Sequence, residues 1–140
     1  MSTPTLESQA RRRPQFRNIH FSQIVQYKLP PSGWVSILHR ISGAALFLCL
    51  PLLLWLFDLS LMSELSFLRL REFVGHWLVK LVLLGLIWAF LHHVIAGVRY
   101  LFLEIGFGLD KTAARKSAIA VLAVSIPLTL LAALPLFGVI

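Results

Sequence analysis

Charged residues are scarce in this sequence of 140 residues. They make up 14% of the chain, whereas hydrophobic residues make up 58%. Soluble domains carry about 25% charged residues, so this chain has too little polar surface to cover a water-soluble monomer. Cysteine is nearly absent as well. The single cysteine, Cys49, lies inside an apolar run, which argues against a disulfide framework and against a cysteine-based zinc site.

Acidic residues are the second shortage, because six Asp and Glu stand against 13 Lys and Arg, for a net charge of +7. A basic chain binds nucleic acid when its basic residues form a solvated face. Here they lie at the ends of apolar runs, which is typical of membrane proteins. We therefore expect a lipid bilayer as a partner and no nucleic acid. A small proton-coupled transporter would need carboxylates inside the membrane. Five acidic residues are expected outside the spans, which argues against this function: Asp58, Glu64, Glu72, Glu104 and Asp110.

Three apolar stretches are each long enough to cross a membrane, which takes about 20 residues. They run from about residue 35 to 57, from 77 to 98 and from 118 to 140. The sequence thus predicts an all-α integral membrane protein with three transmembrane helices in residues 29–140, preceded by an N-terminal segment in residues 1–28. Ser32, in the run Pro30-Pro31-Ser32-Gly33, is the predicted cap of the first helix.

The basic residues also predict the direction of the chain. Ten lie before or at the start of the first span, or between the second and third: Arg11, Arg12, Arg13, Arg17, Lys28, Arg40, Arg99, Lys111, Arg115 and Lys116. The loop between the first two spans offers Arg69 and Arg71, with Lys80 just inside the next helix. The positive-inside rule then predicts a cytoplasmic N-terminus and a C-terminus outside. Residues 1–28 lack the pattern of a secretory signal, and a transit peptide in residues 1–13 is the less favoured alternative.

A histidine deep in the second span is the most informative residue, because ionisable groups inside a membrane are functional by default. His93 precedes Arg99 by six residues, so it lies about 9 Å deeper. Its neighbours on the same face, at steps of four residues, are Gly85, Ala89 and Gly97. Such a groove fits close helix packing around a hydrogen-bonded histidine. It equally fits a haem, whose flat ring needs small residues beside its axial imidazole.

The adjacent His92 is the weaker ligand candidate. It points about 100° away from His93 around the helix, so the two cannot ligate one iron from opposite sides. Its own face carries Trp88 and Ala96, and we predict a role in packing or hydrogen bonding. Since His39 lies near the membrane surface, the second ligand of any haem is expected from another chain.

A polar cluster opens the first span. Ser36 and Arg40 are four residues apart and share a helical face, which Gly43 and Ala44 continue as a place for close approach. Arg40 is either a cation that reaches the membrane surface or part of a polar pocket there. In such a pocket Ser36 would donate to a carbonyl oxygen and Arg40 would stabilise developing negative charge.

Two motifs resemble one family. The run S-I-L-H-R-I-S-G, Ser36 to Gly43, is similar to the first-helix signature S-x-x-H-R-x-[ST]-G of the cytochrome b556 subunit of succinate dehydrogenase, the larger membrane anchor of respiratory complex II. The run H-x-x-x-G-x-R, from His93 to Arg99, is similar to the second signature of that family. Tyr27 to Pro30 also fits, whereas Tyr100 stands where many members have a histidine.

The resemblance implies a three-helix anchor that packs with a smaller anchor subunit around haem b, alongside an iron–sulfur subunit and a flavoprotein subunit. It implies that His93 is an axial ligand of the haem iron, that Ser36 and Arg40 bind ubiquinone, and that His39 and Arg99 lie near the haem propionates. The complex would act as a succinate:quinone oxidoreductase. This chain would hold no catalytic residue for the dicarboxylate, whose chemistry belongs to another subunit.

Other functions compete with this interpretation. One is a small structural or assembly membrane protein without haem, in which the histidines only pack helices. Another is the anchor of a fumarate reductase, which runs the reverse reaction. For location we expect a multi-pass protein of the bacterial cytoplasmic membrane, with the mitochondrial inner membrane as the less favoured alternative.

Overall fold

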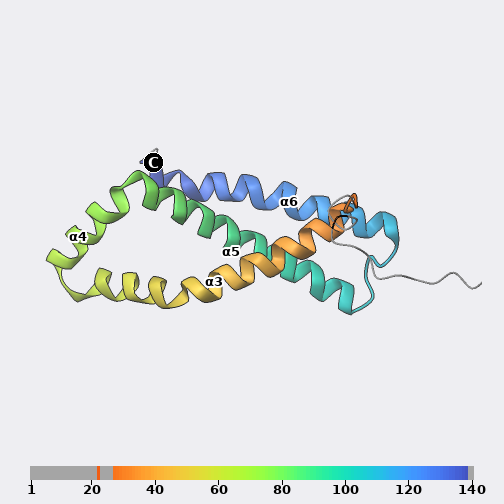
Figure 1. Ribbon diagram of the computed structural model, residues 1–140, viewed down its shortest axis with the longest axis horizontal. Coiled ribbons are helices and arrows are strands. Elements are labelled where there is room, and N and C mark those ends of the chain that lie inside the picture. The colour runs from red at the N-terminus through yellow and green to blue at the C-terminus, as the bar shows by residue number, and fades with distance from the viewer. Residues whose placement is uncertain (1–21, 23–26, 139–140) are drawn as a thin grey trace, which may run out of the picture.

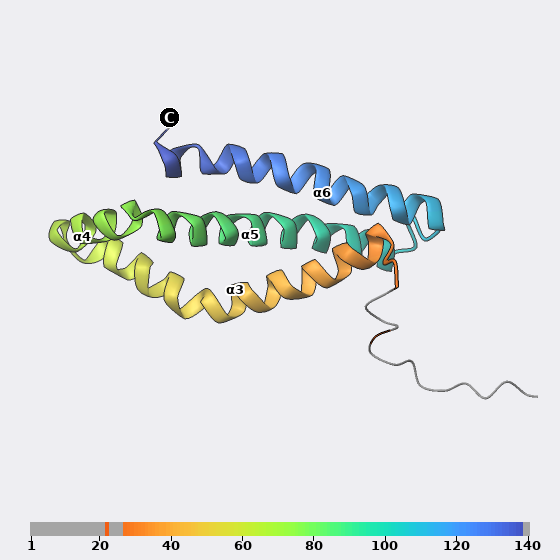
Figure 2. The same ribbon diagram turned by 45° about the horizontal axis from the view of Figure 1, so that its top comes forward.

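The computed structural model of this protein describes residue 22 and residues 27–138, and every regular element in them is helical (Figure 1). The elements are α3 (Pro31–Met62), α4 (Glu64–Gly75), α5 (Trp77–Glu104), α6 (Lys111–Ala133) and the 3₁₀ turn η1 (Pro135–Phe137). Helix α5 lies between α3 and α6 and packs against both (Figures 1 and 2). Most of the predicted N-terminal segment, residues 1–21 and 23–26, falls outside the described residues.

The prediction of three membrane-spanning helices is confirmed. The segments Pro31–Met62, Trp77–Glu104 and Lys111–Phe137 are long and apolar enough to cross a membrane. Their ends differ from the predicted ones, and Asp58 and Glu104 lie in the last turns of α3 and α5 rather than beyond the helices. A helix extends past its apolar run where water and headgroups satisfy its polar side chains: the 32 residues of α3 measure about 48 Å, against about 30 Å of hydrocarbon.

The prediction that Ser32 caps the first helix is wrong. Helix α3 begins at Pro31, and its N-cap residue is Pro30, which makes no side-chain cap hydrogen bond. Proline suits the first helical position because its φ angle is already helical and its missing N–H has no partner to lose there. Ser32 therefore lies inside the first turn.

Helix α4 is an element that the sequence did not predict. Ser63 caps it, and the side chain of Ser66 returns to the backbone N–H of Ser63 at 3.0 Å. Ser66 also donates to the carbonyl of Leu59 at 2.8 Å, which fixes α4 against the end of α3. At 12 residues of mixed polarity, α4 is too short and too polar to register as a membrane span.

Small side chains hold the long helices together. Four of the six buried apolar residues are alanines, and the buried polar residues include Ser42, Ser125 and Thr129. Large apolar side chains face outward instead, as Phe47 and Leu48 do with 74% and 75% of their surface exposed. This distribution is expected in lipid, where apolar side chains gain nothing by leaving the surface and small residues let helices approach closely.

Candidate functional site at the crossing of α3 and α5

His93 contacts α3 through one ring nitrogen. Its Nδ1 lies 3.1 Å from the carbonyl oxygen of His39 and 3.3 Å from the hydroxyl oxygen of Ser42, and Ser42 itself donates to the same carbonyl at 2.9 Å. A carbonyl only accepts hydrogen bonds, so the contact requires the proton of the imidazole to be on Nδ1. Nε2 then keeps its lone pair, and it has no hydrogen-bond partner among the described residues.

Gly43 makes room for the ring of His93. A Cβ atom added to this glycine would lie 2.7 Å from Cε1 of His93 and 3.2 Å from Nδ1, which is well inside van der Waals contact. The sequence predicted that something approaches closely at Gly43, and the group that does so is the imidazole of His93. Together with the buried Ser42, Gly43 forms a seat on α3 that fits this one side chain.

The ring of His39 stacks on the ring of His93. Their centroids are 4.1 Å apart and their planes differ by 7°, while Gly97 and Tyr100 lie on the other sides of His39. Lone pairs of imidazole nitrogens lie in the plane of the ring, so two rings stacked face to face do not point their nitrogens at a shared metal ion. His39 and His93 are therefore not arranged as two axial ligands of one iron.

His92 faces the interior of this chain. Its side chain has no exposed surface and stacks on Trp88 with centroids 5.1 Å apart. Neither ring nitrogen has a hydrogen-bond partner, although a backbone group of Val35 lies close to the ring. Because no face of His92 is open, a bound cofactor has no access to it, whereas His93 is only partly buried.

The predicted small-residue face of α5 packs only in part. Ala89 is buried, and a Cβ at Gly97 would lie 3.6 Å from Nε2 of His39. Gly85 has open space around it. The face is thus closed from Gly97 to Ala89 and open at Gly85, two turns deeper than His93.

Arg99 joins α5 to α6. Its Nε donates to the hydroxyl of Ser117 at 2.9 Å, and one terminal nitrogen donates to the carbonyl of Ala114 at 3.2 Å. The guanidinium also lies over the ring of Tyr100, 5.3 Å from the centroid, and only 8% of the residue is exposed. Two of its five N–H groups are used in these contacts, so three remain for another ligand.

Ser36 and Arg40 lie one turn apart at the start of α3, at the end of the molecule where α5 ends and α6 begins (Figure 1). Ser36 is partly buried and Arg40 is exposed. Within the described residues neither side chain makes a hydrogen bond or an ion pair. Both are therefore free to bind an outside ligand.

The comparisons with known proteins agree with the two motifs. Residues 10–132 match the family model of the succinate dehydrogenase/fumarate reductase transmembrane subunit. The chain belongs to this family. Curated relatives include the succinate dehydrogenase cytochrome b556 subunits of Paracoccus denitrificans, 35% identical over 79% of this chain and 85% of the relative, and of Coxiella burnetii, 38% identical over 73% and 82%. That of Rickettsia felis is 35% identical over 75% and 82%.

The donor set of this family member suits a metal that is already held by a macrocycle. In the described residues no group of three or more His, Cys, Asp or Glu side chains could hold a free metal ion. What α5 offers is one imidazole with Nε2 free and Nδ1 hydrogen-bonded to a carbonyl, which is how axial and other metal-binding histidines are usually oriented. The residues present therefore fit a haem.

Two contacts of the site were not predicted from the sequence. Ser42 touches the predicted ligand His93, and Ser117 holds Arg99. The only signal for Ser42 was its place in the first-helix signature, directly before Gly43. Ser117 carried no signal, because nothing in the sequence shows which turn of the third span lies beside Arg99.

Proposed function

We propose that this chain is the haem b-binding membrane anchor of a succinate:quinone oxidoreductase and that it helps to form the site where ubiquinone is reduced. The observation that carries the proposal is the orientation of His93, whose Nδ1 is bound to the carbonyl of His39 so that Nε2 is available for iron. The printed names of the relatives support the same reading.

His93 would supply one ligand to the haem iron, and the second would come from the smaller anchor subunit. The full burial of His92 and the stacking of His39 on His93 favour a ligand from outside this chain. The haem supplies one-electron redox chemistry when bound. Ser42 and the carbonyl of His39 keep the proton on Nδ1, and Gly43 keeps the ring close to α3. His39 and the three unused N–H groups of Arg99 serve the propionates.

Ser36 and Arg40 serve the quinone. Reduction of ubiquinone to ubiquinol takes up two electrons, from the iron–sulfur subunit, and two protons. The hydroxyl of Ser36 donates a hydrogen bond to one quinone carbonyl oxygen, and the guanidinium of Arg40 stabilises the negative charge that develops on it. Both belong at the cytoplasmic surface of a bacterial inner membrane, where protons are available. The dicarboxylate is oxidised on the flavoprotein subunit, away from this chain.

Paired histidine variants test the haem ligand. In the complex purified from membranes, His93→Ala is expected to lose or strongly alter the reduced-minus-oxidised haem spectrum, whereas His92→Ala keeps it. Gel analysis of the subunits shows whether each variant assembles. Normal haem spectra in both assembled variants would refute the assignment of His93.

Arg40→Gln tests the quinone site. Succinate–ubiquinone reductase activity is expected to fall by on the order of 10²-fold, as at dedicated sites that stabilise developing charge. Oxidation of succinate with an artificial acceptor that takes electrons from the soluble subunits is expected to persist. Lys116→Gln, which removes an exposed basic residue at the start of α6, is the matched control. Unchanged ubiquinone turnover in an assembled Arg40→Gln complex would leave Arg40 as a topology-setting cation.

A further inference from the structure

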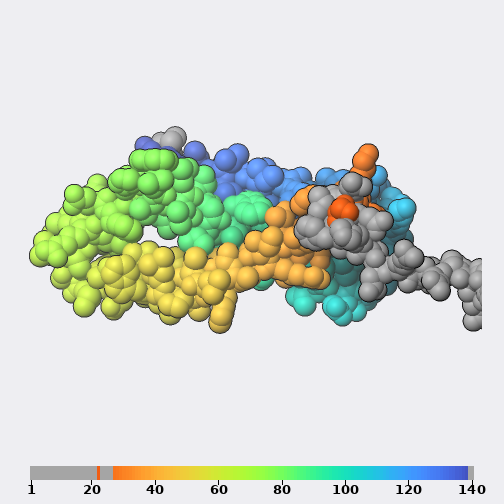
Figure 3. All heavy atoms as spheres, viewed as in Figure 1, coloured from red at the N-terminus to blue at the C-terminus, as the bar shows by residue number. Residues whose placement is uncertain are grey.

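The second half of α3 runs apart from α5. Pro51 lies in the middle of α3, where it removes one backbone hydrogen bond and crowds the preceding turn, so the helix bends. Figure 2 shows α3 changing direction in this region, and Figure 1 shows α4 joining the far end of α3 to the start of α5. The spheres of Figure 3 leave an opening between α3, α4 and α5, so side chains do not fill this space.

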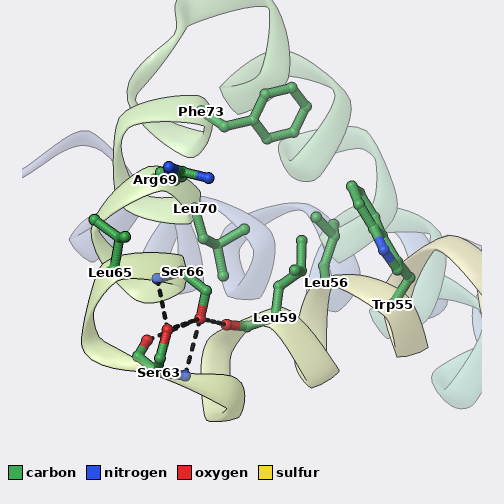
Figure 4. A pocket seen from close by; sticks show the side chains of 9 residues that line it. All are labelled: Trp55, Leu56, Leu59, Ser63, Leu65, Ser66, Arg69, Leu70 and Phe73. Atoms are coloured by element: carbon green, nitrogen blue, oxygen red, sulfur yellow. Dashed lines mark hydrogen bonds between the residues drawn. The ribbon is translucent and has the colours of Figure 1, made fainter.

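A cavity of about 430 Å³ lies between the end of α3 and α4 (Figure 4). This volume is within the range of roughly 300–1,000 Å³ that is typical of small-molecule sites. Its lining residues are Trp55, Leu56, Leu59, Ser63, Leu65, Ser66, Arg69, Leu70 and Phe73. The hydroxyl of Ser63 donates to that of Ser66 and accepts from the backbone N–H of Ser66, and the hydroxyl of Ser66 lies within hydrogen-bond distance of the carbonyl of Leu59. Most of the hydrogen-bonding capacity of the two serines is therefore already used inside the protein.

Arg69 is the one cation of this cavity. It is exposed, and within the described residues it makes no hydrogen bond or ion pair. It also lines a second cavity, between α4 and the start of α5, together with Glu72 and His76. An unpaired guanidinium at the rim of an apolar cavity matches a ligand that has an anionic group to pair with the arginine and an apolar tail to lie against the walls.

The depth of the cavity in the membrane points to the same ligand. Trp55 lines the cavity near the end of α3, and Trp77 is the first residue of α5, directly after α4. They have 55% and 63% of their surfaces exposed, and exposed tryptophans mark the level of the lipid headgroups. Arg69 lies on α4, between the two helices, and Leu56 and Leu59 line the cavity on α3. Charge near the headgroups and apolar walls beside them match the two parts of a phospholipid.

We propose that this cavity binds one phospholipid molecule, whose phosphate pairs with Arg69 and one of whose acyl chains lies against Trp55, Leu56 and Leu59. Arginine is suited to the task because its planar guanidinium forms two parallel hydrogen bonds to a phosphate. A quinone carries no anion for Arg69 to pair with, so its chemistry matches the cavity less well. The proposal does not depend on the binding of haem or ubiquinone.

Photocrosslinking tests this site in the protein purified from membranes with its accompanying subunits. The probe is a phosphatidylglycerol with a diazirine in one acyl chain, and the control probe is the corresponding diacylglycerol, which lacks the phosphate. We expect the phospholipid to label peptides of residues 55–73 and the diacylglycerol to label them much less. Arg69→Gln removes both charge-assisted hydrogen bonds to the phosphate and should lower the labelling about tenfold or more. Arg71→Gln, at a residue that lines neither cavity, should not change it.

Several outcomes would overturn the proposal. They are equal labelling by the two probes, unchanged labelling after Arg69→Gln, and cross-links from these residues to a neighbouring subunit in place of lipid. Leu59→Trp fills the apolar part and is expected to abolish labelling while leaving Arg69 intact. The comparison of the two probes on the unsubstituted protein needs no variant, so it decides the question even where a substitution impairs assembly. Normal haem spectra in the Arg69→Gln protein keep this test separate from that of the proposed function.

Discussion

Replacing Gly43 by alanine tests the seat of His93 with a single methyl group. The added Cβ would lie 2.7 Å from Cε1 of His93, whereas carbon atoms in contact prefer about 3.5–4.0 Å. The ring must therefore retreat by about 0.8 Å or more, and the retreat pulls Nδ1 away from the carbonyl of His39. Overpacking of this kind costs about 1–3 kcal/mol. Since the strain falls on the proposed ligand, haem affinity should fall by about 5- to 150-fold.

The measurements are the haem content of the purified complex and its reduced-minus-oxidised spectrum. Gly75→Ala is the matched control, because it adds the same methyl group at the end of α4, away from the face of His93, at a position with no atom within 4 Å, and it should leave both quantities unchanged. If Gly43→Ala bound haem with normal affinity and a normal spectrum, the contact between α3 and His93 would not be part of the haem site.

Three further predictions concern other residues. Ser42→Ala removes an oxygen near Nδ1 of His93, which weakens the hydrogen bonding that orients the proposed ligand. The reduction potential of the haem, measured by redox titration, should rise by at most about 60 mV, and Ser42→Thr should restore it. His92→Leu removes a buried ring whose two nitrogens have no hydrogen-bond partner, a desolvation cost of about 1–3 kcal/mol. The haem spectrum should therefore stay normal, and the variant should lose haem on heating at no lower temperature than the unsubstituted protein; an altered spectrum would contradict this. For the direction of the chain, single cysteines at Glu72 and Leu109, both exposed, are introduced into a Cys49→Ala background; an impermeant reagent outside intact cells should label only the former, and labelling at Leu109 would reverse the topology.

The sequence predicted the number of long helices because the apolar runs are long and almost free of charge. It predicted their ends less well, since a helix continues past the hydrocarbon for reasons that hydropathy does not record. The start of α3 illustrates this, because the helix begins at Pro31, which suits the first helical position, and Ser32 does not act as its cap. Helix α4 was missed because it is too short and too polar to be recognised as a membrane span, and its capping box pairs Ser63 with a serine instead of the usual Glu or Gln.

The candidate site was predictable to the extent that it is carried by motifs. Ser36, His39, Arg40, His93 and Arg99 were all singled out from spacing and resemblance. The partners of His93 on α3 were not, because a contact between two helices depends on their register and crossing point. Neither the register nor the crossing point can be deduced from the sequence of one helix alone. The same reason hid Ser117, whose position beside Arg99 follows only from how α5 and α6 lie together.

The turns of α3 from Ser36 to Gly43 serve two proposed ligands at once, and this has a consequence for how the family diverges. Ser42 and Gly43 contact the imidazole of His93, whereas Ser36 and Arg40 make no hydrogen bond with it in the described residues. A descendant that lost its haem but still reduced quinone would be released from the first pair of constraints only. Its Gly43 would be free to acquire a side chain, while Ser36 and Arg40 would stay. One sequence signature therefore combines two sets of constraints, one from the haem and one from the quinone, that selection is able to separate.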